Sequence, residues 1–535
     1  MTRHLLTLLV FTPAIGALLV ALVPNRSRAL MSWLAVAVSL VPAFFAFELW
    51  NLFDRKYGDF QFVEHFGWLP GIGASYFVGI DGISLLLVAL TVFLTPLVLV
   101  SAMDTVHTKV KGYLVAMLLL ETTMLGTLVA LDLLLFYVFW ELMLVPMFLI
   151  IGVWGGERRM YASIKFLLFT MVGSLPMLAA ILYLVFAHTQ AAGVPSFALT
   201  DLYGTAMPTS AATLCFLAFF LAFAVKVPMF PLHTWLPDAH VEAPTGGSVI
   251  LAGVLLKMGT YGFLRFVIPL FPNVMAASAT WIAVLAVIGI VYGALVAMVQ
   301  PDMKKLVAYS SVSHLGFVML GIASLNTPGV EGAVYQMLNH GVSTGALFLL
   351  VGVVYERRHT RLISEYGGLW KPLPVYAVCF LLIMLSSIGL PGMNGFVGEF
   401  LILLGGFRFD HVLGAIAASG VVLGAAYMLW MYQRVMFGEV TNEKNLAMKD
   451  MSGRELAVIV PLIVLAFVMG VYPKPFFDTM HASVATAIHR IPPAAMAAAG
   501  HVGDARPAKV RLPGTPTSVT YEAPSGAGHA AGATE

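Results

Sequence analysis

Apolar stretches recur along nearly the whole chain and are separated by short turns rich in proline, glycine or charge. The stretches are continuously apolar, which excludes the alternating pattern of a transmembrane β-barrel. Since a spanning helix needs about 20 apolar residues, the pattern predicts an all-α, polytopic membrane protein of about fourteen transmembrane helices. The predicted spans are 4–23, 29–49, 83–103, 113–131, 133–153, 161–186, 211–231, 245–267, 276–299, 306–323, 331–356, 374–404, 412–437 and 455–472.

Composition agrees with this pattern and excludes several other classes of protein. Of the 535 residues, 60% are hydrophobic and 10% are charged, whereas soluble domains carry roughly 25% charged residues. The net charge of +2 gives no reason to expect nucleic acid. No nucleotide-binding glycine motif follows a possible strand, and Cys215 and Cys379 lie inside apolar segments, so we expect no disulfide or metal cluster.

The distribution of lysine and arginine over the loops predicts the orientation of the chain. Successive loops lie on alternate sides of the membrane, and the loops on one side hold most of the lysine and arginine residues. The positive-inside rule places that side in the cytoplasm. Both termini are then periplasmic if the source is a bacterium. The first apolar run continues to about Val23 with no A-x-A site, which favours a spanning helix over a signal peptide. Before the tail, the N-terminus and the loops on the opposite, periplasmic side hold only five lysine or arginine residues: Arg3, Arg55, Lys56, Arg265 and Arg408.

Two regions do not read as spans. Residues 50–82 form a moderately polar loop with spaced aromatic residues, which we expect to lie at the membrane interface. Residues 491–535 are rich in Ala, Gly, Pro and Thr and cannot bury a core, so this tail is expected to be disordered and periplasmic.

Ionisable side chains inside apolar spans are the strongest functional signal. A charge at mid-bilayer costs roughly 2.5–3.5 kcal/mol even on insertion scales, so the default interpretation is functional. Lys165 lies near a helix start and could snorkel, so we interpret it as structural. The buried charged residues are Glu121, Glu141, Lys226, Lys257 and Glu399.

Glu141 and Lys226 could form a static ion pair, but such a pair stabilises poorly because desolvation offsets the attraction. Function is therefore the favoured interpretation. Lys257 has no obvious carboxylate on its own helix, and a buried lysine readily loses its proton, which suits a relay. Glu121 is the weakest candidate, since it could line the same channel or contact a neighbouring subunit.

Two histidines lie between the charged spans, His314 in YSSVSHLGF and His340 in YQMLNHGVSTGALF. A lone histidine on an apolar helix is usually a core residue, but this pair suggests a hydrated axis because polar residues accompany it, namely Ser310, Ser311, Asn339 and Ser343. Histidine titrates near neutral pH, as a proton wire requires. A metal site is not expected because no third ligand follows at a usable spacing.

Helix-breaking residues stand beside two of the buried charges. Pro228, Pro231 and Pro237 follow Lys226, and the sequence Leu-Pro-Gly at 390–392 precedes Glu399. Paired breaks in the two halves of a transporter point to a site at the repeat interface. The loop after the first break could be an uptake funnel for protons or an ordinary solvated turn. Its polar residues are His233, Asp238, His240 and Glu242.

Taken together, Glu141, the stretch KVPMFPLHTWLPDAH, the lysine of LLKMG and the histidine of YSSVSHLGF resemble a known family. The chain looks like the antiporter-like membrane subunits of proton-pumping NADH:quinone oxidoreductase, respiratory complex I, over residues of about 60 to 470. In that family L-type and N-type subunits carry lysine in the twelfth span and M-type subunits carry glutamate. Glu399 therefore indicates the M-type, the counterpart of mitochondrial subunit 4, and so does the polar tail that we expect directly after residue 472.

The resemblance implies two inverted five-helix repeats with broken seventh and twelfth helices. The domains would then be residues 1–112, 113–267 (first repeat), 276–437 (second repeat), 455–472 (last helix) and 491–535 (tail). It also implies proton translocation, with L-type and N-type subunits and the lipid bilayer as partners. NAD, FMN, iron–sulfur clusters and quinone would be bound by other subunits, and this chain would hold no cofactor and no redox centre. The alternatives are a subunit of a multicomponent sodium/proton antiporter and a non-pumping membrane scaffold.

Overall fold

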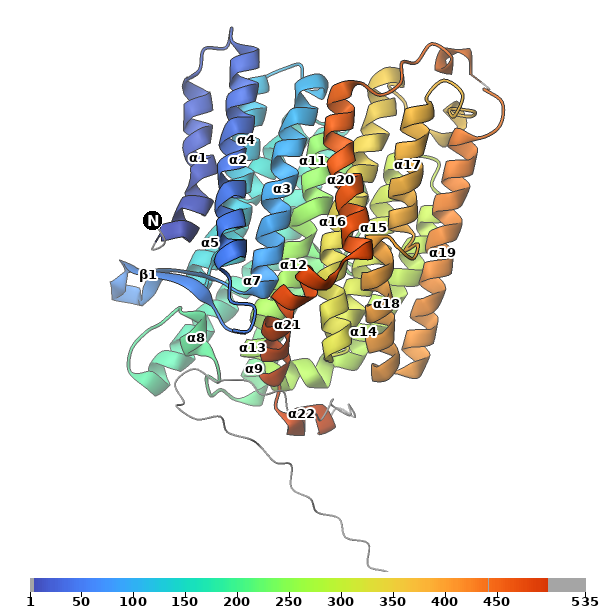
Figure 1. Cartoon of the computed structure of the whole chain (residues 1–535). Helices are drawn as coiled ribbons and strands as arrows, with labels where there is room; N and C mark the ends of the chain where they lie inside the picture. The colour runs from blue at the N-terminus through green and yellow to red at the C-terminus, as the bar shows by residue number, and fades with distance from the viewer. Residues whose placement is uncertain (1–3, 441, 499–535) are drawn as a thin grey trace, which may run out of the picture.

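The computed structural model of the chain describes residues 4–440 and 442–498, and it is a bundle of long helices standing side by side (Figure 1). Thirteen helical segments in this part of the chain are long and apolar enough to cross a membrane. The helices α17 (Pro374–Ser387) and α18 (Asn394–Phe409) together make one further crossing. The prediction of an all-α protein with about fourteen spanning helices is therefore confirmed.

The N-terminal part of the bundle is built from consecutive helices, and each packs against its neighbour in sequence. Residues 133–154 form one crossing made of two helices that follow one another directly. Asp132 starts this crossing, since its side chain accepts hydrogen bonds from the Leu134 and Leu135 amides. The helices are α1 (Leu5–Leu22), α2 (Arg28–Leu52), α3 (Gly82–Thr105), α4 (Val110–Val129), α5 (Leu133–Leu142), α6 (Leu144–Trp154), α7 (Arg159–Ala192) and α8 (Leu199–Leu202).

A β-hairpin replaces part of the loop predicted between α2 and α3. Strand β1 (Gln61–Leu69) pairs with the antiparallel strand β2 (Ala74–Ile80), and the short helix η2 (Pro70–Ile72) connects the two strands. The sequence did not reveal β1 because it lacks apolar alternation, and the buried residue of the strand is the charged Glu64. Its carboxylate accepts a hydrogen bond of 2.8 Å from the Leu6 amide, which ties the hairpin to α1.

The centre of the bundle contains an interrupted helix followed by a helix with two π-helical segments. The first crossing consists of α9 (Thr209–Lys226) and α10 (Trp235–Glu242), so the predicted break after Lys226 is present. The next crossing is completely buried. It runs through α11 (Thr245–Ile250), the π-helical η3 (Leu251–Leu255), α12 (Leu256–Gly262), the π-helical η4 (Phe263–Val267) and α13 (Ile268–Leu270).

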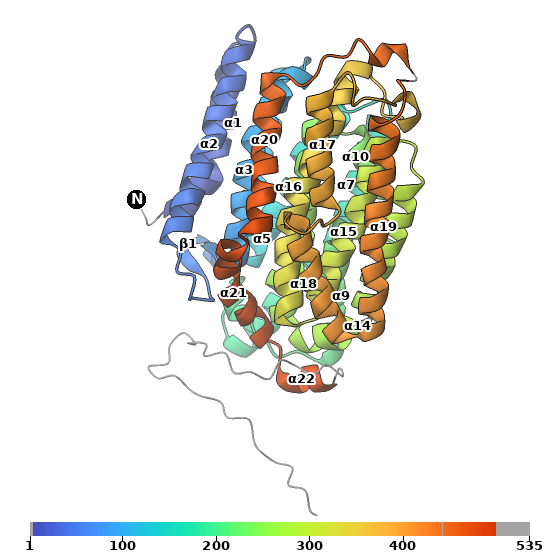
Figure 2. The same cartoon turned by 45° about the vertical axis from the view of Figure 1, so that its right-hand side comes forward.

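The remaining crossings surround the long, buried helix α16 (Thr327–Arg358), which is visible near the middle of Figure 2. Small residues allow its neighbours to approach closely: a Cβ at Gly332 would lie 2.7 Å from the backbone nitrogen of Ile402 in α18. The other elements are α14 (Pro272–Met298), α15 (Met303–Ala323), η5 (Ile363–Glu365), α19 (His411–Met436), η6 (Glu443–Asn445) and α20 (Gly453–Val471).

The prediction that only a polar tail follows residue 472 is wrong. Helix α21 (Lys474–His489) follows almost directly and buries Met480 and Val484 against the bundle. The polar residues Lys474, Asp478 and His481 of this helix hid its amphipathic pattern. The predicted disorder is also wrong for α22 (Pro493–Ala498), and residues 499–535 lie outside the described residues. We call the end of the bundle that carries the β-hairpin, α8 and α21 the hairpin face, and the opposite end the far face (Figures 1 and 2).

Candidate functional site

Four of the predicted site residues form a continuous row through the middle of the bundle. Lys257 Nζ in α12 lies 2.6 Å from His340 Nδ1 in α16. The rings of His340 and His314 have centroids 5.8 Å apart. His314 Nδ1 in α15 lies 3.1 Å from Glu399 Oε1 in α18. Each residue is more than nine-tenths buried. We call Lys257, His340, His314 and Glu399 the central row.

The lysine end of the central row depends on irregular helix geometry. Lys257 is flanked by the π-helical segments η3 and η4, and its Nζ also donates a hydrogen bond to the carbonyl oxygen of Ala252. A π-helical turn frees and redirects backbone groups and is frequent at functional sites. The buried ammonium group therefore receives a backbone partner from its own crossing in addition to His340.

Gln336 is a functional candidate that the sequence analysis missed, and it contacts Asn339, one of the polar residues that accompany His340 in the sequence. The amide nitrogen of Gln336 donates a hydrogen bond of 3.1 Å to Glu399 Oε1 and lies 3.5 Å from His314 Nδ1. Asn339 in turn donates to Gln336 Oε1 over 2.9 Å. The signal that could have identified Gln336 is the spacing 336, 339, 340 and 343, which places four polar residues on one face of α16.

The break between α17 and α18 brings Glu399 to the central row. Gly389 has φ of 74°, a conformation that glycine adopts at little cost, and a Cβ at this position would lie 2.9 Å from Glu399 Oε2. On the α16 side, Ser343 Oγ lies 2.6 Å from Ser386 Oγ, which donates to Asn394 at the start of α18. Side chains from α16 thus join the two halves of the broken helix, and Asn339 also donates to the backbone carbonyl of Asn394 over 2.8 Å.

Lys226 is the last residue of α9 and lies outside the central row. Its side chain is buried, and Nζ has no hydrogen-bond partner among the described residues. It lies 5.3 Å from the centroid of the Trp140 ring and 5.5 Å from that of Phe166, so its charge is solvated by aromatic faces. Among the described side chains, the ammonium group is therefore stabilised by π-systems and not by a direct ion pair.

Glu141 is placed differently from the other buried carboxylates. It is half-buried, one residue before the exposed Leu142, and its carboxylate accepts a short hydrogen bond from Ser174 in α7. The described residues contain no ion pair between Glu141 and Lys226, although the two groups interact through space. The static pair that the sequence left open is therefore not formed in this structure.

A polar cavity of about 190 Å³ opens near the far face. Its lining includes Glu242, Lys304 and Glu356, and its size is sufficient for several waters, since one water needs roughly 10–15 Å³ of such space. His240 lies deeper and interacts electrostatically with both Lys304 and Lys257. Both of its ring nitrogens lack hydrogen-bond partners among the described residues, and its ring stacks on Phe348.

The other predicted residues lie in four kinds of surroundings. Asp238 forms an ion pair of 2.6 Å with Lys165, the lysine interpreted as structural. His233 is buried beside Phe230, with ring centroids 5.9 Å apart. Ser310 and Ser311 are fully buried and donate to the Val307 carbonyl within their own helix. Glu121 is fully buried in α4, and neither carboxylate oxygen has a hydrogen-bond partner in the described part of the chain.

The arrangement is suited to moving protons and poorly suited to holding a metal. Lysine, histidine and carboxylate side chains in contact can pass a proton from one to the next. Within residues 4–440 and 442–498, no three His, Cys, Asp or Glu side chains gather as a metal-binding group, and both cysteines are free and buried. The geometry therefore indicates a proton relay.

Comparisons with known proteins identify close relatives over almost the whole chain. The family described as "NADH:quinone oxidoreductase/Mrp antiporter, TM" matches residues 130–424. NADH-quinone oxidoreductase subunit M of Rhodobacter capsulatus is 48% identical over 494 residues, covering 90% of this chain and 96% of the relative. NADH-ubiquinone oxidoreductase chain 4 of Marchantia polymorpha is 44% identical over 481 residues, covering 90% and 96%. A chain of respiratory complex I from Thermus thermophilus with bound NADH is similar with a TM-score of 0.82 at 36% identity, covering 91% of this chain and all of that chain.

Proposed function

The chain belongs to the NADH:quinone oxidoreductase/Mrp antiporter family, and we propose that it is the M-type subunit that translocates protons in respiratory complex I. The observation that carries this proposal is the central row, in which Lys257, His340, His314 and Glu399 lie in consecutive contact. Such a row lets a proton move along the membrane plane, because the steps at its two ends are at hydrogen-bond distance and the two histidine rings between them lie within reach of one bridging water.

In this proposal protons reach Lys257 from the far face, through the cavity at Glu242 and Lys304 and then His240. They pass along the two histidines, whose Nε2 atoms lack hydrogen-bond partners among the described residues. A cavity of about 10 Å³ borders both rings, which is room for about one bridging water. Protons leave from Glu399 towards the hairpin face.

Lys226 and Glu141 would control when the central row is loaded. Moving one charge against a proton-motive force of roughly 180 mV needs about 4 kcal/mol, at about 2.3 kcal/mol per 100 mV. Making and breaking the interaction between Glu141 and Lys226 can supply an energy of this size, because one pKa unit is about 1.4 kcal/mol and buried groups shift by several units. Glu141 is half-buried, so a conformational change in a neighbouring subunit could reach it.

The chain would receive its energy from other subunits. We propose that it holds no redox centre, and that NAD, FMN, iron–sulfur clusters and quinone are bound elsewhere in the complex. L-type and N-type antiporter-like subunits would pack beside it in a bacterial inner membrane. The far face, which carries Lys304, Arg361 and Lys371, would be cytoplasmic by the positive-inside rule, and both termini would be periplasmic.

Proton-to-electron stoichiometry in reconstituted vesicles of the whole complex tests the proposal. A pump predicts that Lys257→Met and Glu399→Leu each lower the ratio of protons moved per NADH oxidised. Lys165→Met is the matched control, because it removes a partly buried lysine that lies outside the central row. An unchanged ratio for both test variants would favour a non-pumping scaffold, since apolar replacement of buried charges is tolerated there.

Purification in mild detergent distinguishes complex I from a sodium/proton antiporter. Recovery of NADH-oxidising and iron–sulfur subunits with this chain is the expected result. Recovery of small hydrophobic partners alone, together with sodium-dependent proton flux, would move the assignment to the antiporter. A sodium site needs several hard oxygen ligands around one point, whereas the central row offers a lysine amine, two imidazoles and a single carboxylate.

A further inference from the structure

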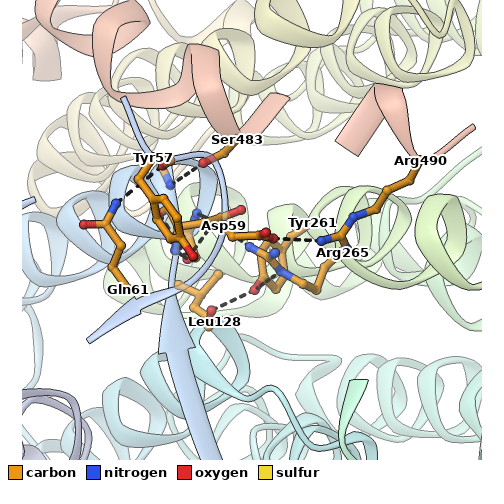
Figure 3. Close-up of polar contacts among 11 residues, drawn as sticks. Tyr57, Asp59, Gln61, Leu128, Tyr261, Arg265, Ser483 and Arg490 are labelled. Atoms are coloured by element: carbon orange, nitrogen blue, oxygen red, sulfur yellow. Dashed lines mark hydrogen bonds and ion pairs between the residues drawn. The ribbon is translucent and has the colours of Figure 1, made fainter. Parts of the chain in front are cut away.

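A second group of charged residues lies on the same crossing as Lys257, nearer the hairpin face. Arg265 in η4 forms an ion pair of 2.5 Å with Asp81, and both side chains are more than nine-tenths buried. Figure 3 shows Arg265 beside Tyr261, with Asp59 and Arg490 next to them. The group draws on the loop before β1, the N-cap of α3, α12, η4 and the C-terminal end of α21. We call Asp59, Asp81, Tyr261, Arg265 and Arg490 the hairpin-face cluster.

The inner part of the cluster has its hydrogen-bonding groups committed. Asp81 Oδ1 accepts from the Ser84 amide over 2.9 Å, from Ser84 Oγ over 3.0 Å and from Arg265. Arg265 Nε donates to the Tyr261 hydroxyl over 2.9 Å, and this hydroxyl donates to the Leu128 carbonyl over 2.8 Å. Arg265 cannot pass a proton onward, because arginine does not release its own proton.

The outer part of the cluster is a second ion pair closer to the surface. Arg490 lies 2.9 Å from Asp59 Oδ1, with about a quarter of each side chain exposed. The Arg490 guanidinium also lies 4.2 Å from the centroid of the Tyr203 ring. A cavity of about 20 Å³ is lined by both pairs and has room for about one water. The contrast with the cavity of about 190 Å³ at the far face is large.

Helix geometry places the cluster directly on the path from Lys257 to the hairpin face. Lys257, Tyr261 and Arg265 follow one another at intervals of four residues, so they share one side of the crossing. Eight residues at a rise of 1.5 Å place Arg265 about 12 Å from Lys257 along the helix. The whole crossing between them is buried.

We propose that the hairpin-face cluster is a proton-tight seal that keeps Lys257 inaccessible from the hairpin face. This inference rests on the proposed function, because a seal matters only if Lys257 carries protons. The two ion pairs close the path in series, and the space between them is too small for a continuous water chain. Lys257 is then loaded from the far face only, and protons that have been pumped cannot return through it. Asp59, Asp81 and Arg490 act on this path by holding other groups in place, so they are positioning residues.

Passive proton leak in vesicles that contain the complete complex tests the seal. Asp81→Asn keeps the size of the side chain and leaves Arg265 without a charged partner, which draws water into the site. We expect the decay of a pH gradient, measured with NADH oxidation stopped, to quicken by roughly tenfold or more. NADH oxidation should continue and should no longer be stimulated by an uncoupler.

The double variant Asp59→Asn with Arg490→Gln opens the outer pair and decides the outcome if Asp81→Asn does not assemble. Its ion pair is partly exposed, so the complex should fold, and leak should rise by a smaller factor of roughly threefold. The matched control removes another ion pair of α21, Lys474 with Asp478 at 2.5 Å, by Lys474→Gln. The control should leave the leak unchanged.

Two results would overturn the proposal. Leak at the control level in the assembled variants would show that the cluster is not a barrier. A loss of both NADH oxidation and pumping without leak would place the cluster on a conducting route. Failure of the proposed function looks different, because Lys257→Met would then keep full coupling and a normal leak.

Discussion

The aromatic surroundings of Lys226 lead to a prediction about Trp140. The ammonium group has no hydrogen-bond partner among the described residues and lies 5.3 Å from the Trp140 ring centroid. A desolvated cation–π interaction contributes about 2 kcal/mol. Trp140→Leu should therefore lower the ratio of protonated to neutral Lys226 about 30-fold, because 1.36 kcal/mol corresponds to a factor of ten. About 2 kcal/mol is also the energy of moving one elementary charge across a membrane potential of roughly 90 mV.

The assay is NADH-driven proton pumping in vesicles as a function of pH on the uptake side. Trp140→Leu should pump poorly near pH 7.5 and recover towards wild type near pH 6, since about 1.5 pH units supply the missing 30-fold in proton concentration. Trp140→Phe keeps a ring and should show a smaller defect. Trp281→Leu is the control, because this tryptophan is exposed on α14.

Two results would refute this reasoning. Normal pumping by Trp140→Leu at every pH would show that the ring does not stabilise the charged lysine. An equal loss at every pH would show that Trp140 acts through packing, because a purely structural defect does not respond to proton concentration. Assembly of the complex, measured by native gel electrophoresis, must be normal for either comparison to hold.

Further predictions concern residues around the same axis. Lys226→Arg should abolish pumping while the complex assembles, because arginine stays protonated; an active variant in the vesicle assay would show that a fixed charge suffices. Gln336→Leu should lower the proton-to-electron ratio, since it removes the amide that joins His314 to Glu399; a normal ratio would contradict this. Lys165→Met should leave that ratio unchanged. Gly332→Ala should reduce assembled complex on native gels, because its Cβ would lie 2.7 Å from a backbone nitrogen of α18 and overpacking costs about 1–3 kcal/mol.

The spanning helices and their two breaks could be predicted from the sequence because each has a strong local cause. Twenty apolar residues in a row have few alternatives to a spanning helix, and proline beside a buried charge marks an interruption. The β-hairpin and α21 lack such a cause. Strand β1 buries the charged Glu64, and α21 mixes Lys474, Asp478 and His481 with its apolar stripe. Both elements are stabilised by what they pack against, which a single sequence does not display.

The members of the candidate site could be predicted, but their contacts could not. Charge inside an apolar span is costly wherever it occurs, so Lys257 and Glu399 stand out in the sequence. Their partners depend on which helices touch: Lys257 contacts His340, which lies 83 positions later, and His314 contacts Glu399, which lies 85 positions later. Gln336 was missed because an uncharged amide costs less to bury and gives a weaker signal.

The two broken helices stabilise their buried charges in different ways. Lys226 is the last residue of α9, where the partial negative charge of a helix C-terminus favours a cation by about 0.3–2 kcal/mol. Glu399 is more than one turn inside α18, beyond the reach of the helix N-terminus, and it is held by His314 and Gln336. The first break therefore supplies electrostatic stabilisation directly. The second break acts by position, because it lets α18 approach α16 closely enough for side chains to reach the carboxylate. Similar sequence signals, a proline beside a charge, thus correspond to two physical solutions that only the packed structure distinguishes.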